Sequence, residues 1–176
     1  MKVKKIFSRI YRKMIFIYDG VNTKKYMKKY NKWLKKEGMD IDGNVKYINH
    51  TAFLDGISYK DIHIGNNSVI SLDCIVLVHD FSVEAGFCAI GKQSKEGEAY
   101  FIKPVYIGNN CFIGAKSIIL PGTTLGDNCI VGAGAVVKGK VPSDSVVVGN
   151  PAKIIGNTVE WGQKHLELKD YIRYGG

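Results

Sequence analysis

The sequence predicts an all-β solenoid of short parallel strands stacked into coils, with a helical arm before it and a helix after it. Three observations support this prediction. Between residues 107 and 148 an aliphatic residue recurs every six positions, glycine follows most of them, and the residue four positions on is small or β-branched. The aliphatic series is Ile107, Ile113, Ile119, Leu125, Val131 and Val137. An α-helix has a period of 3.6 residues and a flat strand a period of 2, so neither explains the pattern.

A period of six suits a coil with three faces, each a short strand that directs one aliphatic side chain inward before the chain turns a corner. One coil cannot bury its inward residues alone, so coils stack and share a continuous core. Earlier members of the series are Ile41, Tyr47, Phe53, Ile64, Ile70 and Val76, with a slip of register over residues 56–61. We therefore predict a solenoid over residues 39–156 with roughly four to five coils.

The repeat is interrupted over residues 82–106, which keep no six-residue register. This segment is far longer than an ordinary connection, and long insertions in compact folds are commonly functional. It combines aromatic with charged residues, namely Phe87, Tyr100, Phe101, Lys92, Lys95, Glu96 and Glu98. The composition predicts an extended loop that contacts a polar substrate.

Residues 1–38 form a basic arm. Residues 1–37 contain thirteen Lys and Arg against Asp19 and Glu37, a net charge of +11, while the rest of the chain carries −2 and the whole chain +9. One predicted helical face contains Val3, Ile6, Phe7, Ile10, Tyr11, Met14 and Ile17. A second predicted helix, capped by Asn22 or Thr23 and ended by Gly38, contains Tyr26, Met27, Tyr30, Trp33 and Leu34.

Two interpretations of the arm stay open. A helical hairpin packs its apolar stripe on the solenoid and leaves its lysines in solvent. Alternatively, a basic amphipathic helix rests on the anionic inner surface of a membrane, where each Lys or Arg adds about 1 kcal/mol. The arm has no motif typical of nucleic-acid binding, so we expect no nucleic-acid partner.

The four cysteines are Cys74, Cys88, Cys111 and Cys129, and three of them fall on the small inward position of the repeat. Ser, Thr, Ala or Val would serve equally well there, and the spacing matches no zinc site. We therefore predict core thiols, no metal and a cytoplasmic location. The longest apolar run near the start, residues 14–18, is too short for a signal peptide or a membrane span.

The six-residue pattern resembles the hexapeptide-repeat acyltransferase family over residues 41–156, and the resemblance implies a left-handed parallel β-helix. Two further motifs are similar to the family: Val131-Gly-Ala-Gly-Ala-Val-Val137, and Pro142 followed by Gly149-Asn-Pro-Ala-Lys153. The chain is most similar to sugar O-acetyltransferases of the maltose, galactoside and surface-polysaccharide kind. The resemblance implies acetyl-CoA as co-substrate and a homotrimer with each active site between two subunits.

His79, immediately before the predicted loop, is the candidate catalytic base. Acyl transfer to a hydroxyl or an amine needs a group that takes the proton of the attacking atom, and an imidazole suits that at neutral pH. In the family a His at the start of the extended loop has this role. Asp80 and Asp55 are candidates to orient or tune the imidazole, or to hold a substrate hydroxyl. His50, His63 and His165 are expected to be structural or solvated.

The resemblance also places the donor side. A pantetheine arm is long and thin, so a groove of small residues lets it lie against the backbone. That groove is expected at Gly132, Ala133, Gly134 and Ala135. The backbone N–H of Ala115 matches the family position that contacts the thioester, and Lys153 matches a basic residue near the adenosine phosphates. A second basic residue usual in the family is absent near Gly156, so Lys138 or Lys140 is expected to contact the 3′-phosphate.

Residues 157–176 leave the repeat. Asn157 can cap a last helix that contains Val159, Trp161, Leu166, Leu168 and Ile172. An uncovered last coil would present unpaired strand edges, so we expect this helix to cover the open end of the solenoid.

These observations predict an acetyltransferase that moves acetyl from acetyl-CoA to a hydroxyl of a sugar or surface-polysaccharide precursor. N-acetylation of a nucleotide-linked amino sugar is an alternative with the same base. A carbonic anhydrase of similar fold needs three His around zinc, whereas position 84 is Glu. A non-enzymatic scaffold or a nucleic-acid binder that uses the basic arm is the remaining alternative.

Overall fold

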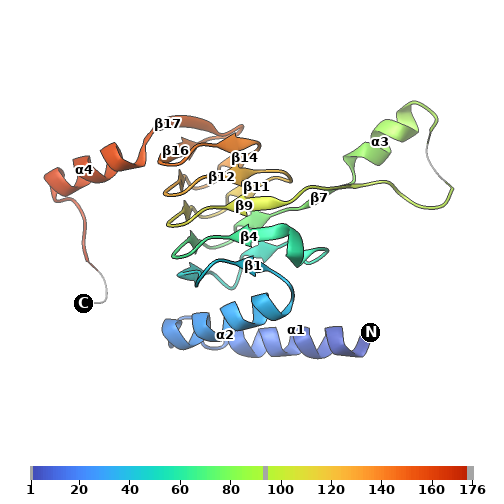
Figure 1. Ribbon diagram of the computed structural model, residues 1–176, viewed down its shortest axis with the longest axis horizontal. Helices are drawn as coiled ribbons and strands as arrows, with labels where there is room; N and C mark the ends of the chain where they lie inside the picture. The colour runs from blue at the N-terminus through green and yellow to red at the C-terminus, as the bar shows by residue number, and fades with distance from the viewer. Residues whose placement is uncertain (1, 93–94, 174–176) are drawn as a thin grey trace.

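Short parallel strands stack in three sheets, one along each face of a solenoid (Figure 1). This computed structural model describes residues 2–92 and 95–173. Face 1 contains β1 (Asp40–Ile41), β4 (Ile62–Ile64), β9 (Val105–Ile107), β12 (Thr124–Leu125) and β15 (Lys140–Val141). Face 2 contains β2 (Tyr47–Ile48), β5 (Val69–Ile70), β10 (Phe112–Ile113), β13 (Ile130–Val131) and β16 (Ser145–Val148). Face 3 contains β3 (Phe53–Leu54), β6 (Ile75–Val76), β11 (Ile118–Ile119) and β14 (Val136–Val137).

In the described residues the strands make four complete coils and a fifth with strands on faces 1 and 2, as the repeat predicts. The sense of coiling, left-handed by resemblance, stays a prediction.

The predicted aliphatic series fills the core of the solenoid. Each of its six members from Ile107 to Val137 is at most 3% exposed. Equivalent residues stack directly on one another, since Ile113 pairs with Ile70 on one side and Val131 on the other. The small positions are buried too, and Cys74, Cys111 and Cys129 are free buried thiols, whereas Cys88 is exposed. The core is therefore continuous from coil to coil, as the periodicity predicts.

The first coil departs from the predicted register by one residue. Ile48 and Leu54 point into the core, while Tyr47 is half-buried and Phe53 is exposed. Both strands begin with an aromatic residue followed by an aliphatic one, so the period alone does not decide which of the two faces inward. The narrow interior accepts the smaller side chain.

A second correction concerns Val141, predicted to occupy a small position. Val141 lies in β15 and pairs with Leu125, so it takes the aliphatic position of the fifth coil. The corner before it contains Lys138 and Gly139, and Gly139 has a φ of +87°, which permits the tight turn. The inward residues Val137 and Val141 are therefore four positions apart and not six, because this corner is shorter while the strands stack as in the other coils.

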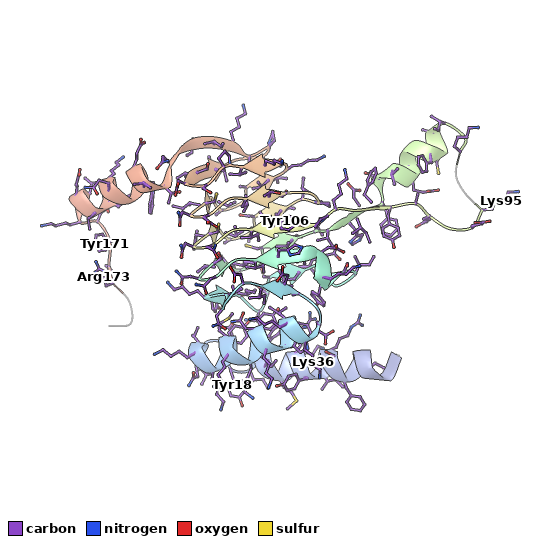
Figure 2. All side chains as sticks on the ribbon, in the orientation of Figure 1. Tyr18, Lys36, Lys95, Tyr106, Tyr171 and Arg173 are labelled. Carbon is purple, nitrogen blue, oxygen red and sulfur yellow. The ribbon has the colours of Figure 1, made fainter. Side chains whose placement is uncertain are left out.

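The insertion is an arm rather than an irregular loop, and it projects away from the solenoid (Figure 1). It begins with β7 (His79–Asp80), continues in α3 (Ser82–Ala89) and returns through β8 (Phe101–Ile102), which pairs antiparallel with β7. Lys95 lies near its far end (Figure 2). Residues 105 and 106, predicted to belong to the loop, lie in β9 and pair with β4. In β9, Val105 and Ile107 are buried and Tyr106 between them faces solvent. This alternation does not show in the six-residue period, so the period did not assign residues 105 and 106 to a strand.

Two helices close the N-terminal end of the solenoid: α1 (Lys2–Phe16) and α2 (Thr23–Lys36). Asn22 caps α2 by accepting a hydrogen bond from the Lys25 N–H. The predicted apolar face of α2 packs on the first coil, where Tyr26 donates to the Ile48 carbonyl at 2.6 Å. Burial of this phenol raises its pKa, so it remains a neutral donor. For α2, packing on the solenoid is confirmed.

For α1 the predicted packing is wrong. The apolar stripe expected to pack inward is exposed from Ile6 to Ile17, and α1 instead uses Ile15, Phe16 and Ser8 toward α2. Trp33 of α2 donates its indole N–H to Ser8 at 2.9 Å. The face that lies against α2 is therefore not the apolar face predicted from the sequence.

The C-terminal segment also departs from expectation. The predicted helix forms as α4 (Thr158–Leu168) and Asn157 caps it, accepting from the Val159 N–H at 2.8 Å. However, α4 projects to the side and does not cover the last coil (Figure 1). Instead β17 (Lys153–Asn157) folds back antiparallel on β16 and extends the sheet of face 2. No described helix has the length and apolarity that a membrane span requires.

Candidate active site

A histidine and a buried aspartate meet where the arm leaves the solenoid. His79 lies in β7, and Asp55 directly follows β3 in the first coil. The Nδ1 atom of His79 contacts Oδ2 of Asp55, which is only 2% exposed. The same carboxylate accepts from the N–H of Val78 at 3.1 Å and of Ile57 at 3.2 Å. These donors compensate for burying a charge and hold the carboxylate in one place.

Asp55 determines which nitrogen of His79 can act as a base. A carboxylate only accepts hydrogen bonds, so the proton of the neutral imidazole lies on Nδ1 and the lone pair on Nε2. The ring of Phe81 lies edge-on to the imidazole at 5.5 Å, and Tyr100 lies 4.8 Å from Phe81. These side chains come from both sides of the arm. The imidazole is therefore fixed in place and partly accessible, as the role of a base would require.

The two aspartates predicted beside His79 have different places. Asp80 is exposed, and its side chain accepts from the Ser82 N–H at 2.8 Å at the start of the arm. That hydrogen bond holds the pKa of Asp80 below its usual range. Asp55, in contrast, is the carboxylate that is hydrogen-bonded to His79. The geometry therefore favours Asp55 for the orienting role.

A cavity of about 1120 Å³ lies between α1, the end of α2 and the first coil. Asp55 forms part of its wall, which places the His79–Asp55 pair at the cavity edge. The basic residues that line it are Arg9, Arg12, Lys13 and Lys60, and the acidic ones are Glu37 and Asp55. Both carboxylates are already engaged, Glu37 by the Ser8 hydroxyl and Asp55 by His79. The cavity therefore has an excess of positive charge.

Arg12 is held in the cavity wall by aromatic rings. Its guanidinium lies 5.4 Å from the ring of Trp33 and 5.7 Å from that of Phe16, and Nη1 donates to the Tyr59 hydroxyl at 3.3 Å. Its buried Nε has no hydrogen-bond partner among the described residues. Arg12 is thus a fixed cation in the cavity wall, and a guanidinium suits a carboxylate or a phosphate.

The small residues predicted to bind the donor gather at the corner between faces 2 and 3, here called the glycine corner. It contains Ala115 in the third coil, Gly132–Ala135 in the fourth and Lys153 at the start of β17. A Cβ on Gly132 would lie 2.7 Å from a methyl carbon of Val148, and one on Gly114 2.7 Å from the backbone of the next coil. The coils approach too closely here for larger residues.

Ala115 has a backbone N–H that stays available. It is the second residue of the turn Gly114–Ser117, which is closed by the Ser117 N–H on the Gly114 carbonyl at 3.3 Å. The Ala115 carbonyl accepts from Gly134, but in the described part of the chain no backbone carbonyl accepts from the Ala115 N–H. An accessible N–H of this kind can bind a developing oxyanion.

His79 and the glycine corner lie at different corners of the same molecule. Residues 72 and 115 are equivalent across neighbouring coils, because β6 pairs with β11 in register. His79 is seven residues beyond position 72, on the far side of face 3. Extended chain rises about 3.3 Å per residue, so roughly 20 Å separates the imidazole from the Ala115 N–H. The fold of the single chain does not bring the two together.

Lys138 and Lys140 do not lie at the glycine corner. Lys138 follows β14 at the corner between faces 3 and 1, and Lys140 lies in β15 opposite Thr124 on face 1. Within one protomer they are on the His79 side, close enough for Lys138 to contribute to the low pKa of Asp80. Of the three predicted basic residues, Lys153 lies at the glycine corner, where it pairs with Val148.

The other histidines pair with aspartates outside the His79 site. His50 contacts Asp19, His63 contacts Asp40 and stacks on Tyr106, and His165 contacts Asp170. In residues 2–92 and 95–173 no group of three or more His, Cys, Asp or Glu could hold a metal ion.

The sequence does not predict the cavity. Lys60 is far along the chain from Arg9 and Arg12, and these two lie among many other basic residues of the arm. One weak signal for a binding site is that the arm has Arg at 9 and 12 and otherwise Lys, because a planar guanidinium suits recognition of a carboxylate or a phosphate.

Comparisons with known proteins agree with this architecture. Residues 104–138 match the family model for the hexapeptide repeat of succinyl-transferase. Protein CapG of Staphylococcus aureus is 35% identical over 140 residues, covering 80% of this chain and 78% of CapG. Galactoside O-acetyltransferase of Escherichia coli K12 is 32% identical over 127 residues, covering 64% of this chain and 61% of that protein.

A solved galactoside acetyltransferase in complex with coenzyme A has the same fold, with a TM-score of 0.59 at 23% identity, over 96% of this chain and 88% of that one. Fold and site together define a parallel β-solenoid with a histidine-based site at the base of an arm. With the sequence relatives added, the assignment is direct: the chain belongs to the hexapeptide-repeat acyltransferase family.

Proposed function

We propose that the protein transfers an acetyl group from acetyl-CoA to a hydroxyl of an acidic sugar, a precursor of a surface polysaccharide. The observation that carries the proposal is the His79–Asp55 pair at the edge of a basic cavity. A galactoside O-acetyltransferase among the relatives and the coenzyme A bound to a protein of the same fold support the reaction class. The expected location is the cytoplasm, where acetyl-CoA is made and cysteines stay reduced.

The mechanism follows from the positions of the groups. Nε2 of His79 takes the proton of the acceptor hydroxyl, whose oxygen attacks the thioester carbonyl carbon. The tetrahedral oxyanion binds the Ala115 N–H. Its collapse breaks the C–S bond, the acetyl group stays on the sugar oxygen, and the protonated imidazole returns its proton to the thiolate. Asp55 keeps the imidazole in the required tautomer and stabilises its protonated form.

Gly132–Ala135 provide the narrow surface along which a pantetheine arm can lie, and Lys153 provides a cation for its phosphates. Lys138 and Lys140, on the His79 side of face 3, are placed for the phosphates of a donor held by the neighbouring subunit.

The separation of His79 from the glycine corner supports an oligomer with shared active sites. A ring closes when one surface of each copy binds a different surface of the next, and three-faced solenoids fit side by side in a trimer. The arm and α4 project in opposite directions and expose apolar residues, among them Ile90, Phe101, Trp161 and Leu166. Such a homotrimer would bring His79 of one subunit against Ala115 of the next.

Mixed trimers test the shared site. Ala115→Pro removes the N–H without breaking the turn, because Leu120–Thr123 is the same turn with Pro121 at the equivalent position. Alone, Ala115→Pro and His79→Ala proteins should each lose at least about 100-fold in kcat. Co-assembled in equal amounts, they should recover about a quarter of wild-type activity, since about three-quarters of the rings are mixed and one of the three sites in each mixed ring is intact. The measurement is thiol release from acetyl-CoA.

The control is a mixture of the two purified variants that have not been allowed to exchange subunits. A monomeric mass by light scattering, or no recovery in verified mixed trimers, would contradict shared sites.

The charge of the cavity predicts the acceptor class. Acetyl transfer to a uronic acid or a phosphorylated sugar should exceed transfer to the matched neutral sugar in kcat/KM. A charged hydrogen bond contributes about 1.5–3 kcal/mol, so Arg12→Gln should reduce kcat/KM for the acidic acceptor about 10- to 100-fold. The effect should fall mainly on KM, and the neutral acceptor should change little.

Lys32→Gln, a change of the same charge on the exposed face of α2, is the matched control. Equal losses with acidic and neutral acceptors would contradict recognition of an acidic group. A nucleotide-linked amino sugar belongs in the same panel, and acetylation of its amine alone would make the protein an N-acetyltransferase.

A further inference from the structure

The outer face of α1 is an uncovered apolar stripe. Six large side chains are between 46% and 73% exposed: Ile6, Phe7, Ile10, Tyr11 and Met14 of α1, and Ile17 directly after it. At 3.6 residues per turn they occupy one continuous side of the helix, nearly opposite Ser8, Arg12 and Ile15, which face α2 and the cavity. Single exposed apolar residues are normal, but a continuous set marks a surface that binds something.

This stripe lies at the N-terminal end of the solenoid. α1 forms the outermost layer there, beyond α2, and β17 and α4 lie at the opposite end (Figure 1). Copies that associate side by side through the faces of the solenoid would leave this end free. The stripe is therefore not explained by the proposed trimer.

The charge around the stripe indicates what covers it. Residues 1–37 carry a net charge of +11. The two acidic side chains of this segment are engaged, Asp19 with His50 and Tyr47, and Glu37 with Ser8. On α2, Lys24, Lys25, Lys28, Lys32, Lys35 and Lys36 are exposed. A second copy placed on the stripe would bring two strongly basic segments together, which opposes pairing at ordinary ionic strength.

We propose that α1 binds an anionic phospholipid bilayer, with its apolar stripe in the boundary between headgroups and acyl chains and Lys side chains of the same basic segment on the phosphates. An apolar stripe on a helix in a basic segment has the complementarity that such a surface requires. An α-helix is about 10 Å across, so the cavity behind α1 would face the solution roughly one helix diameter from the lipid. If the proposed function holds, an acidic acceptor carried on a lipid fits this geometry.

Vesicle sedimentation tests the proposal with the full-length protein. We expect it to sediment with vesicles of equal phosphatidylglycerol and phosphatidylcholine, and far less with pure phosphatidylcholine. Added NaCl should weaken binding without abolishing it, because the stripe contributes independently of charge. The triple variant Phe7→Ser, Ile10→Ser, Met14→Ser keeps every charge and should lower the partition coefficient at least tenfold.

The matched control removes three exposed apolar side chains elsewhere, Ile154→Ser and Ile155→Ser on β17 and Ile172→Ser after α4, and should bind as the wild type does. None of the α1 substitutions lines the cavity, so acetyl transfer to a soluble acceptor without vesicles should be unchanged and reports that the protein is folded. Binding is measured without acetyl-CoA, so its outcome is separate from that of the proposed function.

Three results would overturn the proposal: no sedimentation of the wild type, equal sedimentation with neutral vesicles, or equal loss in both triple variants. A larger particle mass that only the α1 variant reduces, without lipid binding, would show that a second copy covers the stripe instead.

Discussion

The His79→Ala protein should release thiol from acetyl-CoA at a rate about 10²- to 10⁴-fold below the wild type with its best acceptor. The rate falls because the variant lacks the base that takes the acceptor proton. Asp55, the partner of His79, remains buried at the cavity edge. His79 is not among the residues assigned to hold the pantetheine arm or the phosphates, so coenzyme A affinity should change little. Saturating thiol-release kinetics and calorimetric titration with coenzyme A measure the two quantities separately.

His50→Ala is the control, because His50 likewise contacts an aspartate and lines the cavity itself, yet belongs to a different pair. Its kcat should stay within a few-fold of the wild type. A His79→Ala protein that is folded and keeps kcat within a few-fold would remove His79 from the mechanism and, with it, the direct-transfer scheme.

Replacing Asp55 by Asn should lower kcat by about 10²- to 10⁴-fold, although Asp55 does not touch the reacting atoms. An Asn side chain can donate to Nδ1, which favours the tautomer with the proton on Nε2 and leaves no lone pair facing the acceptor. It also removes the charge that stabilises the protonated imidazole. Coenzyme A binding should remain as in the wild type, and kcat should fall more than KM rises.

Asp80→Asn makes the comparison decisive. Asp80 follows His79 in the sequence but bonds to Ser82 at the start of the arm, so its loss should cost far less than that of Asp55. Thermal unfolding of both variants separates a loss of positioning from a loss of folding, because the Asp55 carboxylate also accepts from Val78 and Ile57. Equal losses in the two variants, or a full effect of Asp80→Asn alone, would assign the orienting role to Asp80.

The sequence predicted the repeat well because each coil contributes to the core with residues that are local in sequence. Ile113, for instance, is inward because its own strand and corner place it there, and stacking then repeats the same choice in every coil. The first coil is different, since an equivalent coil stacks on only one side of it and helices pack on the other. Its strands could direct Tyr47 or Ile48 inward, and in the structure Ile48 stacks on Ile70 in the narrow core.

The candidate base was also accessible from the sequence, because His79 is marked by its position just before the interruption of the repeat. Its partner was not resolved: Asp55 and Asp80 were equivalent candidates. Asp80 is adjacent in sequence but extended backbone directs neighbouring side chains to opposite sides, whereas Asp55 lies one coil below. Stacking in register brings residues 24 positions apart into contact.

By itself the sequence determined the solenoid, its number of coils, its helical ends and the histidine at its arm, because these follow from local period and local capping. The tertiary structure decided which face of α1 is covered and that α4 leaves the last coil open. It also decided that Asp55 is the aspartate that holds His79, and that Arg12 and Asp55 line the same cavity. Each of these depends on contacts between segments far apart in the chain, and a periodic pattern does not specify which apolar or charged surface meets which.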